Sequence, residues 1–214
     1  MTSGELKQGV VDTSVSLNDF LIAAASKRAT PGGGAVAALA GALAASMGEM
    51  VLNYSVGRKS SVAHDPALNA GLIEMTNARK LLVLLMVEDQ AAYLELTAAK
   101  KLEPSVVDRA DRIQLALMAA IRAPQSISAT AVRILELASQ VAPIANRWLL
   151  SDLLVACELA MAAVRAGLHN VRVNIPEASS GDQLMLSRQC DELLARAVEV
   201  VKKAVPEIQK HQQL

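Results

Sequence analysis

The sequence predicts an all-α protein, a bundle of five or six long helices in a single domain. Aromatic residues are only 2% of the 214 residues, while 52% are hydrophobic, so Ala, Leu, Val and Met must fill the core. Such a core favours closely packed helices over sheets. Capping and breaking residues divide the chain into long segments without a repeat of fixed period. We expect residues 1–15, which are polar and aperiodic, to be a flexible N-terminal segment, and residues 16–214 to form the helical domain.

The charge balance, the cysteines and the histidines indicate which partners, compartment and cofactors to expect. Lys and Arg (21) equal Asp and Glu (21) without a basic block, so we expect no nucleic-acid partner. The N-terminus lacks the basic and apolar regions of a secretion signal. Cys157 and Cys190 are expected as reduced thiols of a cytoplasmic protein. The three histidines are too scattered for a recognisable metal motif, so we predict no metal and no tightly bound cofactor.

The first helix is predicted by a capping box. Ser16 with Asp19 three residues later is typical of a helix start, and the pattern runs to about Arg28. Residues 29–48 follow without a charge, but Ala, Gly and Ser dominate them. We therefore expect this segment to be buried within the protein and not to span a membrane.

A second helix follows the glycine turn at residues 31–34 and ends near Gly57, which suits a left-handed C-terminal position. Small residues recur along one face of this helix, at Gly34, Ala38, Gly41, Ala45 and Gly48. Larger apolar side chains flank that face, at Val36, Leu39, Leu43, Met47, Met50 and Val51. We expect the small face to admit a neighbouring helix closely and the larger side chains to be buried in the grooves beside it.

The glycine turn also has a chemical interpretation. The first N–H groups of a helix lack internal partners and carry the positive end of its dipole, so Gly32, Gly33 and Gly34 after Pro31 can bind a carboxylate or another acceptor. The alternative is a tight loop before a tightly packed helix. Arg58 and Lys59, past the predicted helix end, either compensate the helix dipole or form a cationic pair at a pocket.

Four further helices complete the prediction. Asp65-Pro66 starts a helix that persists to about Leu102, longer than about 50 Å and therefore spanning the molecule. A boundary at residues 103–105 precedes a second capping pair, Ser105 with Asp108; Pro124 is expected to kink or break the helix that follows, which ends by Pro143. The later segments are a helix at 147–170, an extended stretch at 171–176 and an amphipathic helix beyond Gly181.

Two acids lie on apolar helical faces. The residues three, four and seven positions from Asp89, and likewise from Asp152, include no charged side chain. An unpaired buried carboxylate is costly, so each acid either is structural, capping a neighbouring helix end or bonding Ser and Asn, or faces a polar pocket. Asn146 and Ser151 can orient Asp152, and alternation in the extended stretch can point Asn170, Arg172 and Asn174 the same way.

Taken together, several blocks resemble one family over about residues 16 to 180. They are Pro31-Gly32-Gly33-Gly34 with its Ala/Gly helix, Gly57-Arg58-Lys59, Asp89-Gln90-Ala91-Ala92-Tyr93, Asn146 with Ser151-Asp152, and Asn170-Val171-Arg172-Val173-Asn174-Ile175. The family is the cyclodeaminase/cyclohydrolase family of folate enzymes, found as the C-terminal half of formiminotransferase-cyclodeaminase and as stand-alone methenyltetrahydrofolate cyclohydrolase.

The resemblance implies a cytoplasmic, all-helical dimer that hydrolyses 5,10-methenyltetrahydrofolate to 10-formyltetrahydrofolate. A symmetric dimer would also cover the long apolar helices. The family's catalytic acid falls on Asp89, and Asp152 is expected to hold the pterin edge or the water. The folate groove would be lined by Pro31, Gly32, Gly33, Gly34, Arg58, Lys59, Asn146, Ser151, Asn170, Arg172 and Asn174. Alternatives are formiminotetrahydrofolate cyclodeamination and, from another class, a non-catalytic helical interaction protein.

Overall fold

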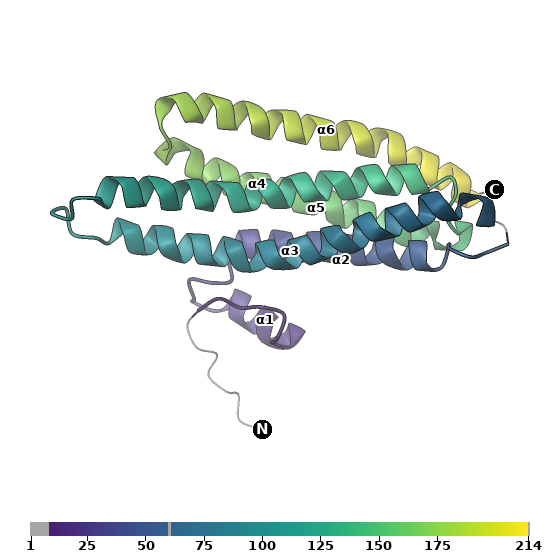
Figure 1. The fold of residues 1–214 in the computed structure, drawn as a ribbon, viewed down its shortest axis with the longest axis horizontal. Helices are drawn as coiled ribbons and strands as arrows, with labels where there is room; N and C mark the ends of the chain where they lie inside the picture. Colours follow the sequence, from purple (N-terminus) through teal and green to yellow (C-terminus); the bar gives the residue numbers. More distant parts are fainter. Residues whose placement is uncertain (1–8, 60, 214) are drawn as a thin grey trace, which may run out of the picture.

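The computed structural model describes residues 9–59 and 61–213, and within them it contains six α-helices and three short 3-10 helices but no strand (Figure 1). In chain order the elements are α1 (Leu17–Ala25), α2 (Gly33–Asn53), η1 (Val62–His64), α3 (Asp65–Lys100), α4 (Arg109–Val141), η2 (Arg147–Leu149), α5 (Leu150–Asn174), η3 (Ile175–Glu177) and α6 (Ser180–Gln213). The all-α prediction is confirmed, with five long helices and one short one.

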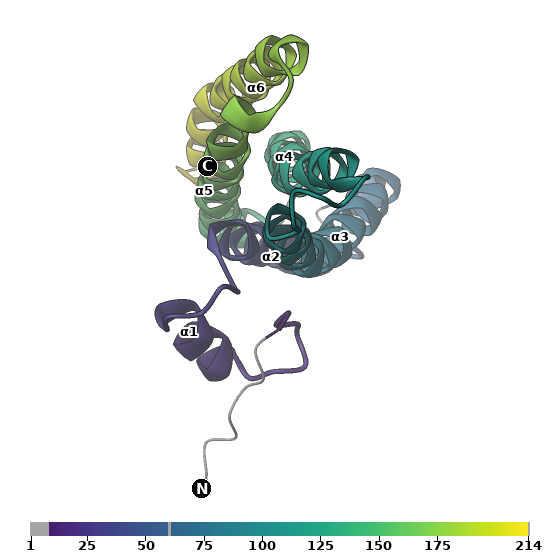
Figure 2. The same ribbon diagram turned by 90° about the vertical axis from the view of Figure 1, so that its left-hand side faces the viewer.

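The long helices form one bundle in which α4 is the most enclosed. Helix α4 packs against α2, α3, α5 and α6, while α2 lies between α3 and α5 (Figure 2). Helix α1 lies outside the bundle beside α2. Both α2 and α4 are long and apolar enough to cross a membrane, but 56% of each apolar window is buried inside the bundle. This burial agrees with the prediction for residues 29–48.

Two helix boundaries differ from the sequence signals, at the end of α1 and at the start of α4. Ser16 Oγ accepts the Asp19 N–H (3.1 Å), as the capping box predicts, although α1 ends at Ala25 and not at Arg28. The predicted Ser105 and Asp108 capping pair is wrong, because α4 begins only at Arg109. The Asp108 carboxylate instead accepts from Arg112 Nε one turn along the helix (2.7 Å).

The small-residue face of α2 is buried as predicted. A Cβ atom on Gly41 would lie 3.1 Å from Leu82 Cδ1 of α3, so the α3 side chains approach the α2 backbone closely. The expectation for the flanking residues is wrong at Val36 and Leu43, whose side chains are 46% and 50% exposed. Gly57 has the expected positive φ of 75°, but it lies past the end of α2 at Asn53.

Pro124 does not break α4, which is continuous from Arg109 to Val141. A proline inside a helix frees the carbonyl four residues earlier, here that of Ala120. The Asn174 side-chain amide donates to this carbonyl (3.3 Å). The helix therefore continues because tertiary packing encloses Pro124 and a neighbouring helix supplies the missing donor.

The predicted extended stretch at 171–176 is also wrong. Helix α5 continues to Asn174 and leads directly into η3. Val171 and Ile175 are buried one turn apart, so apolar packing outweighs the strand preference of β-branched residues. Asn170 and Asn174 consequently share a helical face, and Arg172 points elsewhere.

Part of the segment expected to be flexible is docked on α3. The backbone N–H of Val11 donates to Gln90 Oε1 (2.9 Å), and Gln90 Nε2 donates to the Val11 carbonyl (2.8 Å). Thr30 Oγ1 also donates to the Gly9 carbonyl (2.7 Å). Residues 1–8 of that prediction lie outside the described residues.

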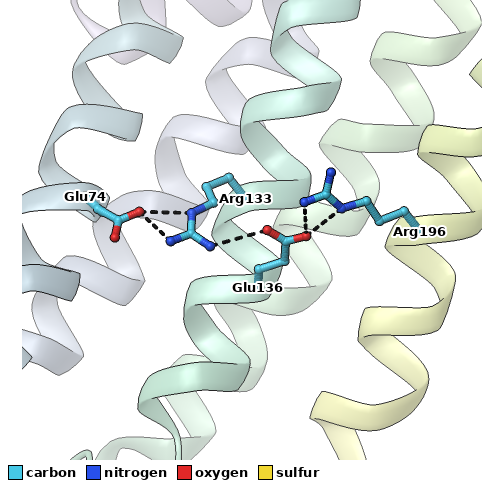
Figure 3. Close-up of polar contacts among 4 residues, drawn as sticks. All are labelled: Glu74, Arg133, Glu136 and Arg196. Atoms are coloured by element: carbon cyan, nitrogen blue, oxygen red, sulfur yellow. Dashed lines mark hydrogen bonds and ion pairs between the residues drawn. The ribbon is translucent and has the colours of Figure 1, made fainter. Parts of the chain in front are cut away.

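A chain of ion pairs joins three helices of the bundle (Figure 3). Arg133 of α4 contacts Glu74 of α3 (2.6 Å) and Glu136 of its own helix (3.4 Å), and Arg196 of α6 contacts Glu136 (2.5 Å). These side chains tie α3, α4 and α6 together without contributing to the cavity described next.

Candidate active site

A cavity lies at the N-terminal end of α2, because the neighbouring helices extend beyond this end. Helix α2 begins at Gly33, whereas α3, α4 and α5 run on past this point (Figure 1). The space beyond the end of α2 is a cavity of about 520 Å³, which we call the glycine-turn cavity. Its walls include Gly32, Gly33 and Gly34, the α3 residues Asp89, Tyr93, Thr97 and Lys100, and Ala120, Asn170, Asn174 and Glu177 opposite.

Asp89 lies at the N-terminus of α2. A Cβ atom on Gly34 would lie 2.0 Å from Asp89 Oδ1, so only glycine admits the carboxylate here. Burial raises the pKa of Asp89 to about 6, and a hydrogen bond from the Ala35 N–H opposes this rise. Both alternatives for this acid therefore hold, because it caps a neighbouring helix and also faces a polar cavity.

The two asparagines on the opposite wall are held through their amide groups. Asn170 Nδ2 donates to the Ala166 carbonyl (2.8 Å), and its Oδ1 lies 3.2 Å from the position of a Cβ on Gly33. Asn174 Nδ2 donates to the carbonyls of Ala120 and Asn170 (3.3 and 3.1 Å). Asn174 uses both of its amide N–H donors in this way and Asn170 uses one, while the side-chain oxygens remain as acceptors beside a carboxylate. This wall suits a ligand that carries N–H donors or positive charge.

The α3 wall contains functional candidates that the sequence reasoning missed. Asp89, Tyr93, Thr97 and Lys100 follow one another at spacings of four, four and three, which places them on one helical face. Lys100 Nζ lies 2.5 Å from Glu177 Oε2. The helical spacing from Asp89 would have identified this stripe, whereas nothing in the sequence connects Glu177 to it.

The structure does not bring the remaining predicted residues into this cavity. The Asn146 N–H donates to Ser55 Oγ just past the C-terminal end of α2 (2.8 Å), and its side chain caps η2. At about 1.5 Å per residue, α2 separates this end from the cavity by about 30 Å. Three more predicted residues lie at that end: Arg58 and Lys59 follow α2, and Asp152 is in the first turn of α5.

Three further predicted residues lie outside the lining as well. Ser151 is exposed beside Asp152, and Pro31 is buried before the cavity-lining glycines. Arg172 turns toward α6, where its Nη2 contacts Asp191 Oδ1 (3.0 Å). Of the predicted site, one chain assembles the following residues in this cavity: Gly32, Gly33, Gly34, Asp89, Asn170 and Asn174.

The side chains of the cavity can transfer a proton and can bind a ligand through electrostatic interactions. Over residues 9–59 and 61–213, no three His, Cys, Asp or Glu side chains cluster as a metal site requires. Burial raises the pKa of the Cys157 thiol to about 12, so this thiol is not a nucleophile near neutral pH. Asp89, with a pKa near the neutral range, is suited to act as a general base.

Comparison with known proteins places these features in a family. The family model of formiminotransferase-cyclodeaminase matches residues 16–189. A methenyltetrahydrofolate cyclohydrolase of Methylorubrum extorquens is 32% identical over 163 residues, which cover 74% of this chain and 78% of that protein. The formimidoyltransferase-cyclodeaminase of Gallus gallus is 28% identical over 82% of this chain, which spans only 33% of that relative.

A solved structure agrees with the fold as a whole. The formiminotetrahydrofolate cyclodeaminase of Thermotoga maritima matches with a TM-score of 0.80 and 26% identity. The match covers 93% of this chain and 96% of that one.

Proposed function

Because the chain belongs to the formiminotransferase-cyclodeaminase family, we propose that it hydrolyses 5,10-methenyltetrahydrofolate to 10-formyltetrahydrofolate. The observation that carries the proposal is the Asp89 carboxylate, which faces the glycine-turn cavity with a pKa of about 6. The stand-alone relative of similar extent is named for this reaction.

The first step is the addition of water to the bridging carbon. Methenyltetrahydrofolate is a cationic amidinium, and the Asp89 carboxylate stabilises its positive charge. As a C–O bond forms, Asp89 accepts one proton from the water, which gives a neutral tetrahedral carbinolamine. The acceptor oxygen of Asn170, beside Gly33, suits an N–H donor of the pterin ring.

The second step opens the bridge. Protonated Asp89 returns its proton to N5 as the C–N5 bond breaks, and the carbinol hydroxyl loses its proton to solvent as the formyl group forms on N10. The reaction consumes one water and releases one proton. A carboxyl with a pKa near 6 can both take and return the proton near neutral pH.

Absorbance of methenyltetrahydrofolate, corrected for spontaneous hydrolysis, tests the proposal with the purified protein. We expect enzymatic decay that Asp89→Asn slows by at least about a hundredfold in kcat. Glu88→Gln, which changes the exposed neighbouring acid, is the matched control and should retain activity. A folded Asp89→Asn with more than about a tenth of the wild-type kcat would place the base elsewhere.

Cyclodeamination is the second candidate, favoured by the similarity to a solved cyclodeaminase along 93% of the chain. In that reaction N10 attacks the formimino carbon and ammonia leaves, so protonated Asp89 would donate to the leaving nitrogen. Ammonia release from 5-formiminotetrahydrofolate distinguishes the two activities. A non-catalytic interaction protein would show neither activity and no thermal protection by folinic acid.

We propose that the protein is a homodimer formed through α2. The outward side of α2 presents Val36 and Leu43, which one chain leaves half exposed. If a two-fold axis crosses the middle of α2, it pairs the helix antiparallel with its copy. The Arg58 and Lys59 end of one protomer would then lie toward the glycine-turn cavity of its partner, which unites the two groups of predicted residues.

The compartment and the cofactor requirement are part of the same proposal. Cys157 and Cys190 are both free and buried, which suits a reducing cytoplasm. Water and one carboxyl group supply all the protons of the hydrolysis, so we propose that no bound cofactor is needed. Activity should survive exhaustive dialysis against a chelator.

A further inference from the structure

The far end of the glycine-turn cavity contains an ion pair that the proposed reaction does not use. Lys100 is the last residue of α3 and Glu177 ends η3. Lys100 Nζ and Glu177 Oε2 are 2.5 Å apart, and the two side chains are 41% and 45% exposed. Lys100 is the only Lys or Arg among the described residues that line this cavity.

The ion pair is aligned with Asp89 along the cavity. Asp89 and Lys100 are eleven positions apart on one face of α3, which corresponds to about 16 Å. Tyr93 and Thr97 lie between them on the same face. On the other wall, Asn170, Asn174 and Glu177 follow in the same direction, because α3 and α5 run parallel (Figure 1).

An elongated substrate fits this layout in one orientation. With its bridging carbon at Asp89, the pterin ring lies toward the glycine turn, and the p-aminobenzoyl group extends past Tyr93. The glutamate at the far end of the substrate then reaches Lys100. Its carboxylates are the only anionic groups of the substrate, so they require a cation at this end.

We propose that Lys100 binds a carboxylate of the substrate's glutamate and that Glu177 occupies Lys100 in the empty protein. This inference rests on the proposed function and assigns the tail-binding role to Lys100 of the same chain. An exposed ion pair contributes little net free energy, so a substrate carboxylate can replace Glu177 without a large cost. Glu177 is then a competitor, and its removal should favour anionic substrates.

Two substrates and two variants test the assignment. The substrates are 5,10-methenyltetrahydrofolate and 5,10-methenyltetrahydropteroate, which lacks the glutamate. Lys100→Met should raise KM for the folate by roughly tenfold and leave KM for the pteroate nearly unchanged. Glu177→Gln should lower KM for the folate, and raised salt should reduce both effects through screening.

Lys101→Met is the matched control, because Lys101 is exposed and does not line the cavity. Equal KM increases for both substrates in Lys100→Met, or a higher folate KM in Glu177→Gln, would overturn the assignment. Failure of the proposed function looks different, because the wild-type protein would then hydrolyse neither substrate. Circular dichroism of each variant separates these outcomes from misfolding.

Discussion

At the scale of single residues, the site depends on one contact between Asp89 and the backbone of α2. Gly34 has no side chain, so the Asp89 carboxylate can approach the start of α2 and accept the Ala35 N–H. The helical-face pattern predicted that Asp89 is unusual, and the glycine turn predicted open N–H groups. Their direct contact was not predictable, because it depends on how α2 and α3 pack.

The raised pKa of Asp89 gives opposite pH dependences for activity and stability. An unfolded carboxyl titrates near about 3.9, so the folded state, with a pKa of about 6, binds the proton more tightly. The free energy of unfolding therefore decreases as pH rises from about 4 to about 6. Asp89→Asn carries no charge, so urea unfolding should show it gaining stability relative to wild type over this range.

Over the same pH range, from about 4 to about 6, kcat should rise with pH while the free energy of unfolding falls. Below about pH 6 the base is protonated, so kcat should fall about tenfold per pH unit. Glu88→Gln should keep both wild-type profiles. A kcat that does not change between pH 5 and 7 would contradict the assignment of Asp89 as the base.

A series of alanines in the glycine turn should have graded effects. A Cβ on Gly32 meets nothing within 4 Å, one on Gly33 lies 3.2 Å from Asn170 Oδ1, and one on Gly34 lies 2.0 Å from Asp89 Oδ1. Gly34→Ala should therefore displace the carboxylate and lower kcat most, with Gly33→Ala intermediate. If Gly32→Ala and Gly34→Ala lose equal activity, the turn acts through its own flexibility and not through Asp89.

At the scale of elements, two errors in the sequence interpretation concern the same contact between helices. Pro124 indicated a break in α4, and residues 171–176 indicated an extended stretch, yet both segments are helical. Because Pro124 lacks an N–H, the Ala120 carbonyl is free, and Asn174 on the prolonged α5 donates to it. The proline and the β-branched residues do disfavour a helix locally. Whether the helix continues through them depends on the contact between α4 and α5.

Replacing Pro124 tests whether this contact positions Asn174. Pro124→Ala restores a backbone donor for the Ala120 carbonyl and should release the Asn174 side chain. We expect the free energy of unfolding to hold or rise, while KM for methenyltetrahydrofolate increases several-fold, roughly the value of one hydrogen bond.

The control is a double-mutant cycle. Asn174→Ala should raise KM by a similar factor, and the double variant should lose no more than either single variant. Additive losses would show that Pro124 and Asn174 act independently.

At the scale of the whole molecule, the sequence determined helix number and order better than the geometry of the site. Start and stop signals placed α3 within two residues of its observed end, because Pro66 and the 103–105 boundary act locally. The predicted groove mixed two ends of the bundle, since Asp152 satisfies the same helical-face test as Asp89. Apolar neighbours on a helical face indicate that a residue is buried. They do not indicate which part of a neighbouring helix that residue contacts.

The exposed apolar side of α2 leads to the prediction about assembly. One chain leaves Leu43, at the centre of α2, 50% exposed. A charge buried at a two-fold contact is costly and occurs twice, so Leu43→Glu should dissociate the dimer. Sedimentation velocity at micromolar concentration should then show a monomer with an unchanged circular dichroism spectrum.

Leu115→Glu is the matched control, because Leu115 is an exposed leucine (73%) on α4, outside the proposed interface. It should sediment as the wild-type protein does. If Arg58 and Lys59 act across the interface, Leu43→Glu should also raise KM for methenyltetrahydrofolate while Asp89 remains in place. A wild-type monomer would refute the dimer, and a dissociated Leu43→Glu with wild-type KM would confine the site to the cavity of one chain.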